Sequence, residues 1–161
     1  MEQFTIQKND FLSHDCTGYF HLYYVGYGQP GNPDYLNTLK NIFVSTHPDT
    51  LRAASRQAAT LMIQDIPQVM DAEGLDTAIL MAVPRSKSGM CNWQLGFKAA
   101  VRTTVKALQA DNLSVIDGTD CISRHTSTKM THLRKPVSNF ENTGSDPYPG
   151  ITKDTCDIQN K

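Results

Sequence analysis

Residues 78–108 read AILMAVPRSKSGMCNWQLGFKAAVRTTVKAL, and they indicate the fold more clearly than any other stretch. The stretch begins with an unbroken apolar run from Ala78 to Val83, which has the length and composition of a strand buried on both faces. Pro84 ends this run. From Trp93 to Leu108, apolar side chains recur at helical spacing. The pattern therefore predicts a buried strand, a short loop and an amphipathic helix, which together begin a βαβ unit.

The loop between this strand and this helix is short, polar and basic. It contains Arg85, Ser86, Lys87, Ser88 and Gly89. Backbone N–H groups at the start of a helix attract anions, and an arginine can bind two oxygens of one phosphate while a lysine adds a point charge. We therefore expect a phosphate or pyrophosphate site in this loop. The alternative is a surface loop that carries two exposed cations.

On the N-terminal side, residues 1–30 are predicted to form a β element. The strand signals lie at Phe4–Ile6 and from Gly18 to Tyr27, where aromatic and β-branched residues are dense. In an α/β protein such an element would serve as a hood over the main sheet or as its edge.

Two helices are expected next, near 33–44 and 50–70. Asn32 is suitably placed to cap the first, and a residue at 49 or 50 to cap the second. Pro67 should bend or shorten the last turns of the second helix, because proline lacks the N–H group that a helix interior needs. Glu73-Gly74 should close this helix.

After the helix at 93–110, short strands are predicted at 113–116 and 120–124. Residues 124–136 are basic and rich in hydroxyl groups, and residues 137–161 form a polar tail that is predicted to be loop, with at most one helical turn at 152–156. The prediction is one α/β domain over residues 1–136, in which helices flank a sheet with mainly parallel strands.

The amino-acid composition indicates a globular protein. The chain has 161 residues, of which 39% are hydrophobic and 19% charged, and these values are typical of a globular domain. It contains no apolar run of the roughly 20 residues that span a bilayer, so we expect a cytoplasmic protein without membrane contact. In that compartment its four widely spaced cysteines should be free thiols.

The charges are unevenly distributed along the chain. Residues 85–135 contain nine Lys or Arg and three Asp, whereas residues 1–84 contain four basic and nine acidic residues. A cationic region in an otherwise acidic protein suits an anionic ligand, and the alternative is a solvated surface. The net charge of −1 makes nucleic acid an unlikely partner.

The order of these pieces resembles the type I phosphoribosyltransferases, in particular their competence-associated and amidophosphoribosyltransferase-like branch. The resemblance rests on Val83-Pro-Arg-Ser-Lys, on the helix containing Trp93-Gln-Leu-Gly-Phe, and on the segment from Ile122 to Arg134. It implies that residues 85–89 bind the pyrophosphate of phosphoribosyl pyrophosphate (PRPP). It also implies a flap over that ligand, with contributions from Arg124, Thr128, Lys129, His132, Arg134 and Lys135.

One element of that family is missing from this sequence, namely an apolar strand that ends in two acidic residues and leads into a Thr- and Gly-rich phosphate loop. The resemblance therefore implies binding of PRPP, pyrophosphate or a nucleotide, with Mg²⁺ as a possible companion of PRPP. Complete phosphoribosyl transfer is expected only if a longer native chain or a second chain completes the site.

Another class of function remains open, namely a non-enzymatic interaction or regulatory module, for example in a bacterial defence assembly, that pairs with a partner or a second copy through an exposed sheet edge. A metal protein is not expected. His14, Cys16, Cys121 and His125 are ligands of the types that zinc prefers, but their spacing is loose, and we expect no metal ligand set.

Overall fold

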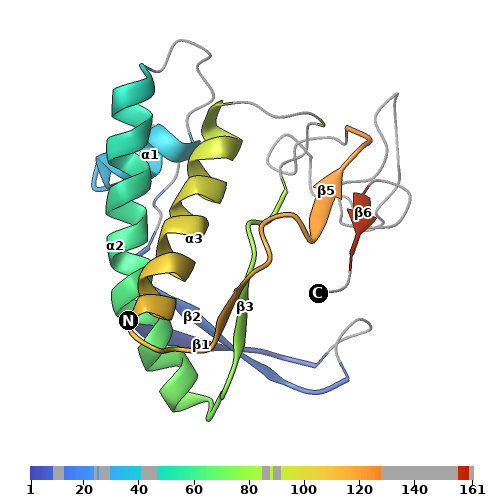
Figure 1. Cartoon of the computed structure of the whole chain (residues 1–161). Helices are drawn as coiled ribbons and strands as arrows, with labels where there is room; N and C mark the ends of the chain where they lie inside the picture. The colour runs from blue at the N-terminus through green and yellow to red at the C-terminus, as the bar shows by residue number, and fades with distance from the viewer. Residues whose placement is uncertain are drawn as a thin grey trace.

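The computed structural model describes residues 1–8, 13–23, 25, 30–40, 47–84, 88, 92–127 and 156–159. These residues form a mixed α/β structure of helices and short strands (Figure 1). In chain order the elements are β1 (Glu2–Ile6), β2 (Cys16–Phe20), α1 (Asp34–Lys40), α2 (Pro48–Ala72), β3 (Ala78–Leu80), α3 (Asn92–Ala110), β4 (Val115–Asp117), β5 (Ile122–Arg124) and β6 (Cys156–Ile158).

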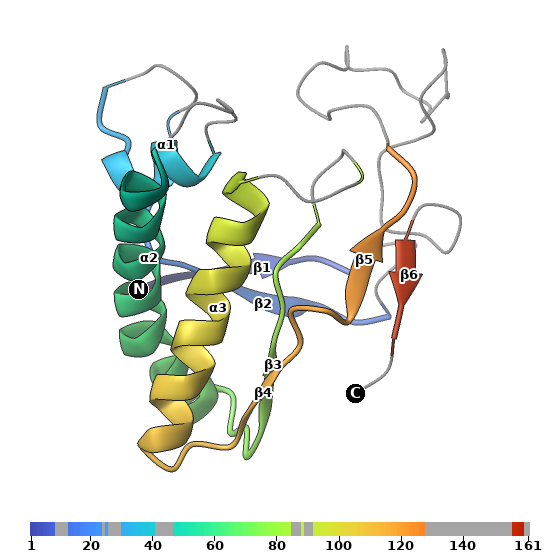
Figure 2. The ribbon, with the colours of Figure 1, turned by 45° about the horizontal axis from the view of Figure 1, so that its top comes forward.

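The centre of the fold is the unit β3–α3–β4. Strands β3 and β4 pair in parallel, with Ile79 opposite Ile116, and α3 connects them. Figure 2 shows α3 between α2 on one side and these two strands on the other. The predicted βαβ unit is thus confirmed, although both strands are shorter than expected and β4 begins two residues later than the predicted start at 113.

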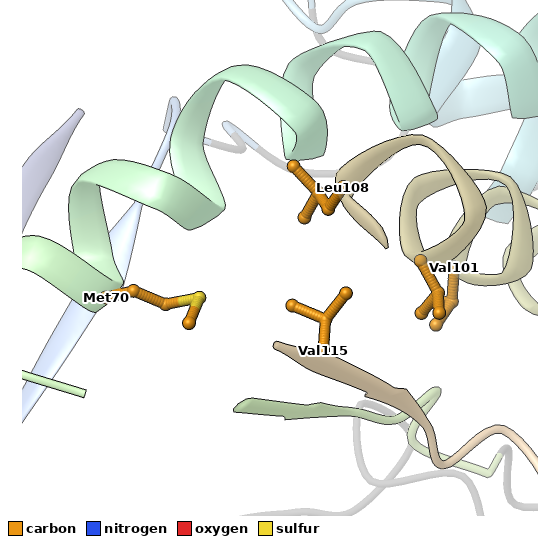
Figure 3. Packing of buried hydrophobic residues seen from close by; sticks show 5 residues of the cluster. Met70, Val101, Leu108 and Val115 are labelled. Carbon is orange, nitrogen blue, oxygen red and sulfur yellow. The ribbon is translucent and has the colours of Figure 1, made fainter. Parts of the chain in front are cut away.

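The hydrophobic core lies where α2 and α3 meet one face of the β3–β4 pair. Its buried members are Met70 of α2, Val101, Val105 and Leu108 of α3, and Val115 of β4 (Figure 3). The apolar residues of α3 recur at i, i+4 and i+7, so one stripe of the helix faces the strands and α2. The helical periodicity in the sequence therefore predicted this buried face correctly.

The run 78–83 is covered on one face only, which corrects the expectation of burial on both faces. Ala78, Leu80 and Ala82 pack against the core, whereas Ile79, Met81 and Val83 are 43%, 49% and 76% exposed. Successive side chains of a strand point to opposite faces, so the alternation follows directly from extended backbone. A run without polar residues does not reveal whether its second face is covered.

Helix α2 differs from its prediction at its N-terminal end. Its N-cap is His47, whose Nδ1 accepts a hydrogen bond from the N–H of Asp49 at 3.3 Å, and not a residue at 49 or 50. The helix continues through Pro67 to Ala72, so the proline does not shorten it. The predicted end at Glu73–Gly74 is confirmed, since Gly74 has a φ of +62°, a conformation that glycine adopts without strain.

Helix α1 occupies Asp34–Lys40, and residues 41–44 of its predicted range lie outside the described part. The Oδ1 of Asn32, the predicted cap, accepts a hydrogen bond from the N–H of Val25 at 3.0 Å, and the carbonyl of Pro33 accepts from the N–H groups of Leu36 and Asn37. Leu39 of α1 is completely buried and faces Gly96 of α3, so α1 closes the end of the core near the start of α3.

The N-terminal β element is an antiparallel hairpin of β1 and β2. Its second strand begins at Cys16 and ends at Phe20, earlier than the predicted run to Tyr27. Two side-chain contacts attach the hairpin to α2: the Tyr19 hydroxyl donates to Glu73, and His21 Nδ1 lies 2.7 Å from Asp65 Oδ2. The hydrogen bond to Glu73 raises the pKa of Tyr19 above its usual value.

Part of the C-terminal tail belongs to the fold, contrary to the prediction of loop or a helical turn. Strand β6 pairs antiparallel with β5, and the N–H of Gln159 donates to the carbonyl of Cys121 at 2.8 Å. Cys156 is only 2% exposed. Backbone pairing with a distant strand, rather than local sequence, therefore determines the conformation of residues 156–158.

Within the described residues, no helix combines the length and the apolar composition that crossing a membrane requires.

Candidate functional site

The predicted phosphate loop follows β3 and precedes α3, as the sequence indicated. The backbone leaves β3 at Leu80, passes the buried Pro84, and enters α3 at Asn92. Of the predicted pyrophosphate-binding residues the structure describes Ser88, whereas Arg85, Ser86, Lys87 and Gly89 lie outside the described part of the chain.

Ser88 is in direct contact with the segment that follows β5. The N–H of Ser88 donates to Ser127 Oγ at 3.0 Å, and the two hydroxyl oxygens are also 3.0 Å apart. These residues are 39 positions apart in the sequence. The contact places the loop after β3 beside the start of the basic segment 124–136, which the resemblance assigned to the flap.

Of the predicted flap residues, the structure describes Arg124. It is the last residue of β5, opposite Cys156 of β6, and is only 8% exposed. Its contribution to a flap stays a prediction. The remaining predicted flap residues lie outside the described part of the chain: Thr128, Lys129, His132, Arg134 and Lys135.

A charged network fixes the loop after β4, next to the same end of the sheet. The loop begins with Asp117, whose Oδ1 accepts hydrogen bonds from the N–H and the hydroxyl of Thr119 at 2.9 and 2.7 Å. Two cations of α3 reach across to it. Lys98 Nζ lies 2.9 Å from Asp120 Oδ1, and Arg102 Nη2 lies 2.8 Å from Asp120 Oδ2.

These cations lower the pKa of Asp120 below its usual value. The hydrogen bond from Lys98 is the largest cause, and burial opposes it. Arg102 also contacts Thr119 Oγ1 through its Nε at 3.1 Å. Both oxygens of Asp120 are thus already bound to cations. The network holds the β4 loop against α3, and Lys98 and Arg102 are committed to it rather than to a ligand.

This network was not predicted from the sequence, although the spacing of its residues could have indicated it. Lys98 and Arg102 are four residues apart and so project from the same side of a helix. Asp117 and Asp120 follow the next predicted strand. In a βαβ unit the second strand lies beside the helix that precedes it, and this spacing would have been enough to predict ion pairs.

No metal site is evident among the residues that the structure describes, where no group of three or more His, Cys, Asp or Glu side chains is placed to hold an ion. Three of the four cysteines are described, and Cys16, Cys121 and Cys156 form no disulfide with one another.

Comparison of the chain with protein-family models, with curated proteins and with solved structures finds no match. The functional interpretation therefore depends on the residues of this chain.

Proposed function

We propose that this protein binds the pyrophosphate or phosphate groups of PRPP or of a nucleotide, between the loop after β3 and the segment after β5, as a phosphoribosyltransferase-like protein. The observation that carries the proposal is the contact between Ser88 and Ser127. It lies between the predicted phosphate loop and the start of the segment that the resemblance assigns to the flap. Binding, rather than phosphoribosyl transfer, is the function proposed for these residues.

The chemistry of the two segments supports an anionic ligand. The loop carries Arg85 and Lys87, and the segment after Ser127 carries Lys129, Arg134 and Lys135. Lys98 and Arg102 are paired with Asp120, so the proposal assigns the phosphate to the cations of these two segments. Hydroxyl groups such as those of Ser88 and Ser127 can exchange their mutual hydrogen bond for bonds to phosphate oxygens.

Mg²⁺ has a place in this proposal as a companion of the ligand. In the described part of the chain no acidic cluster is arranged to bind an ion by itself. Mg²⁺ commonly retains several waters and bridges substrate phosphates with few protein ligands, so it would enter bound to PRPP.

The test is isothermal titration calorimetry of the full chain with PRPP and with pyrophosphate, each with and without Mg²⁺. We expect saturable binding that the double variant Arg85→Ala/Lys87→Ala loses. The control is Lys8→Ala/Lys106→Ala, which removes the same charge from two exposed residues outside the proposed site. Absence of binding to the wild-type chain at millimolar ligand contradicts the proposal, and so does equal binding by the two double variants.

A second candidate function is a protein-interaction module, and the exposed face of β3 and β4 favours it. Ile79, Met81 and Val83 of the β3 run and Ile116 of β4 are between 38% and 76% exposed. A methyl group added at Gly118 would lie 2.6 Å from Met81 Cγ and 2.7 Å from Ile79 Cγ2, so these side chains adjoin one another. Among the described strands, β3 and β4 pair only with each other.

The occupant proposed for this apolar face is a second copy of the chain. Analytical ultracentrifugation over a range of concentrations should show a reversible dimer, and Met81→Lys should shift it to monomer, because a buried lysine in the interface is costly. Ile6→Lys places the same charge on an exposed residue of the hairpin, and it should leave the dimer intact. A wild-type chain that remains monomeric at all concentrations excludes this candidate.

A further inference from the structure

A hollow between α2 and α3 lies apart from the proposed phosphate site. It has a volume of about 250 Å³ and is lined by Leu51, Arg52, Ser55 and Arg56 of α2 and by Gly96, Ala99 and Thr103 of α3. We call it the α2–α3 groove. The residues of each helix recur at helical spacing, so the groove follows the line along which the two helices meet.

Small residues create the groove. The two helices approach closely where the hydroxyl of Ser55 donates to the carbonyl of Gly96 at 2.8 Å. Gly96 and Ala99 then leave little side chain to fill the space beside that contact. A Cβ atom at Gly96 would lie 3.0 Å from Leu51 Cδ1, so the Leu51 side chain gives the groove an apolar surface beside Gly96.

The charges of the groove are all positive. Arg52 and Arg56 lie one helical turn apart on α2, and no acidic residue belongs to the lining. Arg52 is paired with Asp49. Arg56, by contrast, is exposed, and its guanidinium forms no ion pair with any residue that the structure describes. Thr103, at the α3 wall, adds a hydroxyl that can donate or accept a hydrogen bond.

From this arrangement we infer that the α2–α3 groove binds a small organic carboxylate with a compact apolar body. The guanidinium of Arg56 binds the carboxylate through two parallel hydrogen bonds. Leu51, Gly96 and Ala99 cover the apolar body of the ligand. This site uses neither Arg85 nor Lys87, and it therefore does not depend on the proposed phosphate site.

Size and charge both favour such a ligand over a nucleotide or a peptide. The volume lies just below the roughly 300–1,000 Å³ that are typical of pockets for drug-sized molecules. A phosphate group carries up to two negative charges and commonly needs several cations, whereas here Asp49 neutralises Arg52 and leaves Arg56 as the available cation. A single guanidinium balances the charge of a single carboxylate and can form two parallel hydrogen bonds with it.

The experiment is an NMR titration of the full-length, ¹⁵N-labelled chain with benzoate at low ionic strength. Benzyl alcohol, which has a similar shape but no charge, is the comparison ligand. Benzoate should produce saturable shifts of the Ser55, Gly96 and Thr103 amide signals. Arg56→Gln should weaken binding about tenfold or more, because a charge-assisted hydrogen bond is lost. Ala99→Phe should abolish binding by filling the groove while the charge stays unchanged.

Two controls separate this site from other effects. Lys106→Gln removes one positive charge elsewhere on α3 and should leave the affinity for benzoate unchanged. Arg85→Ala/Lys87→Ala should also retain benzoate binding, so that failure of the phosphate site and failure of the groove give different results. The inference is overturned by shifts that do not saturate, by equal binding of benzyl alcohol, or by undiminished binding to Arg56→Gln.

Discussion

Asp120, which follows β4, forms ion pairs that position the β4 loop against α3. Its carboxylate receives Lys98 and Arg102 from α3 at 2.9 and 2.8 Å, and it is 60% exposed. Exposed ion pairs contribute little individually, about 0–1 kcal/mol, because water and salt screen them. The network has a positional role instead, since it holds the β4 loop on α3.

The lowered pKa of Asp120 predicts a specific dependence of stability on pH. A carboxyl group with a lower pKa in the folded state stabilises the fold above its unfolded pKa, and this contribution disappears as the pH falls through the folded value. With an ordinary value of 3.8, the loss therefore begins near pH 4 and continues below it.

Asp120→Asn should lower the free energy of unfolding by about 1 kcal/mol or less at pH 7. It should also reduce the loss of stability between pH 5 and pH 3, because the titrating group is gone. Urea unfolding at both pH values measures the two quantities. Asp76→Asn, a change at another exposed carboxylate, is the matched control. An unchanged acid dependence in Asp120→Asn would contradict the assignment.

At the scale of elements, α2 is unusual because it contains a proline without ending there. Pro67 has no N–H group to donate to the carbonyl of Ile63, and its ring crowds that carbonyl. One turn of the helix is therefore weakened. The side-chain amide of Gln68 donates to the carbonyl of Gln64 at 2.9 Å in the same region. Packing explains why the helix persists, since Ile63, Ile66 and Met70 contact the core on both sides of the proline.

Pro67→Ala should stabilise the protein by about 1–3 kcal/mol, because it restores one helical hydrogen bond and removes the steric conflict. Thermal and urea unfolding would measure this change. Ala72→Ser, at the exposed end of the same helix, should have a much smaller effect. A less stable Pro67→Ala variant would show that the packing of the core depends on proline at this position.

Strand β3 illustrates what an apolar pattern leaves open. Its sequence contains no polar residue between Ala78 and Val83, yet one face packs on α3 and α2 while the other is exposed. Contiguous exposed apolar side chains commonly mark interaction surfaces in natural proteins. The exposure of Ile79, Met81 and Val83 therefore corrects the prediction that this run is buried on both faces. It also supports the second candidate function, a protein-interaction module.

At the scale of the whole molecule, β5 and β6 bring segments from distant parts of the sequence together. Arg124 lies opposite Cys156, and both residues are buried. Cys121 is 5% exposed and Cys156 is 2% exposed. The pairing thus encloses two thiols that reagents in water cannot reach unless β6 separates from β5.

In the background Cys16→Ser/Cys91→Ser, we expect the thiols of Cys121 and Cys156 to react slowly with a thiol reagent such as Ellman's reagent under native conditions. Both should react rapidly in urea, because unfolding exposes them. Restoring Cys16, which is partly exposed, should add one faster-reacting thiol. Rapid reaction of Cys156 in the native background would contradict the burial of β6.

Sequence alone determined the features that depend on local periodicity. The amphipathic α3, the long α2 with its end at Glu73–Gly74, and the parallel β3–α3–β4 unit were all predictable, because helical and strand spacing directly report which residues share a face. The basic loop after β3 was also predictable, because it lies between the apolar run of a strand and the periodic pattern of a helix.

Tertiary structure decided what depends on partners distant in the sequence. It placed Ser88 against Ser127, paired residues 156–158 with β5, and tied Asp120 to Lys98 and Arg102. It also left one face of β3 uncovered and opened the groove beside Gly96. Local spacing shows which face of an element is apolar, whereas the segment that covers that face depends on the path of the entire chain.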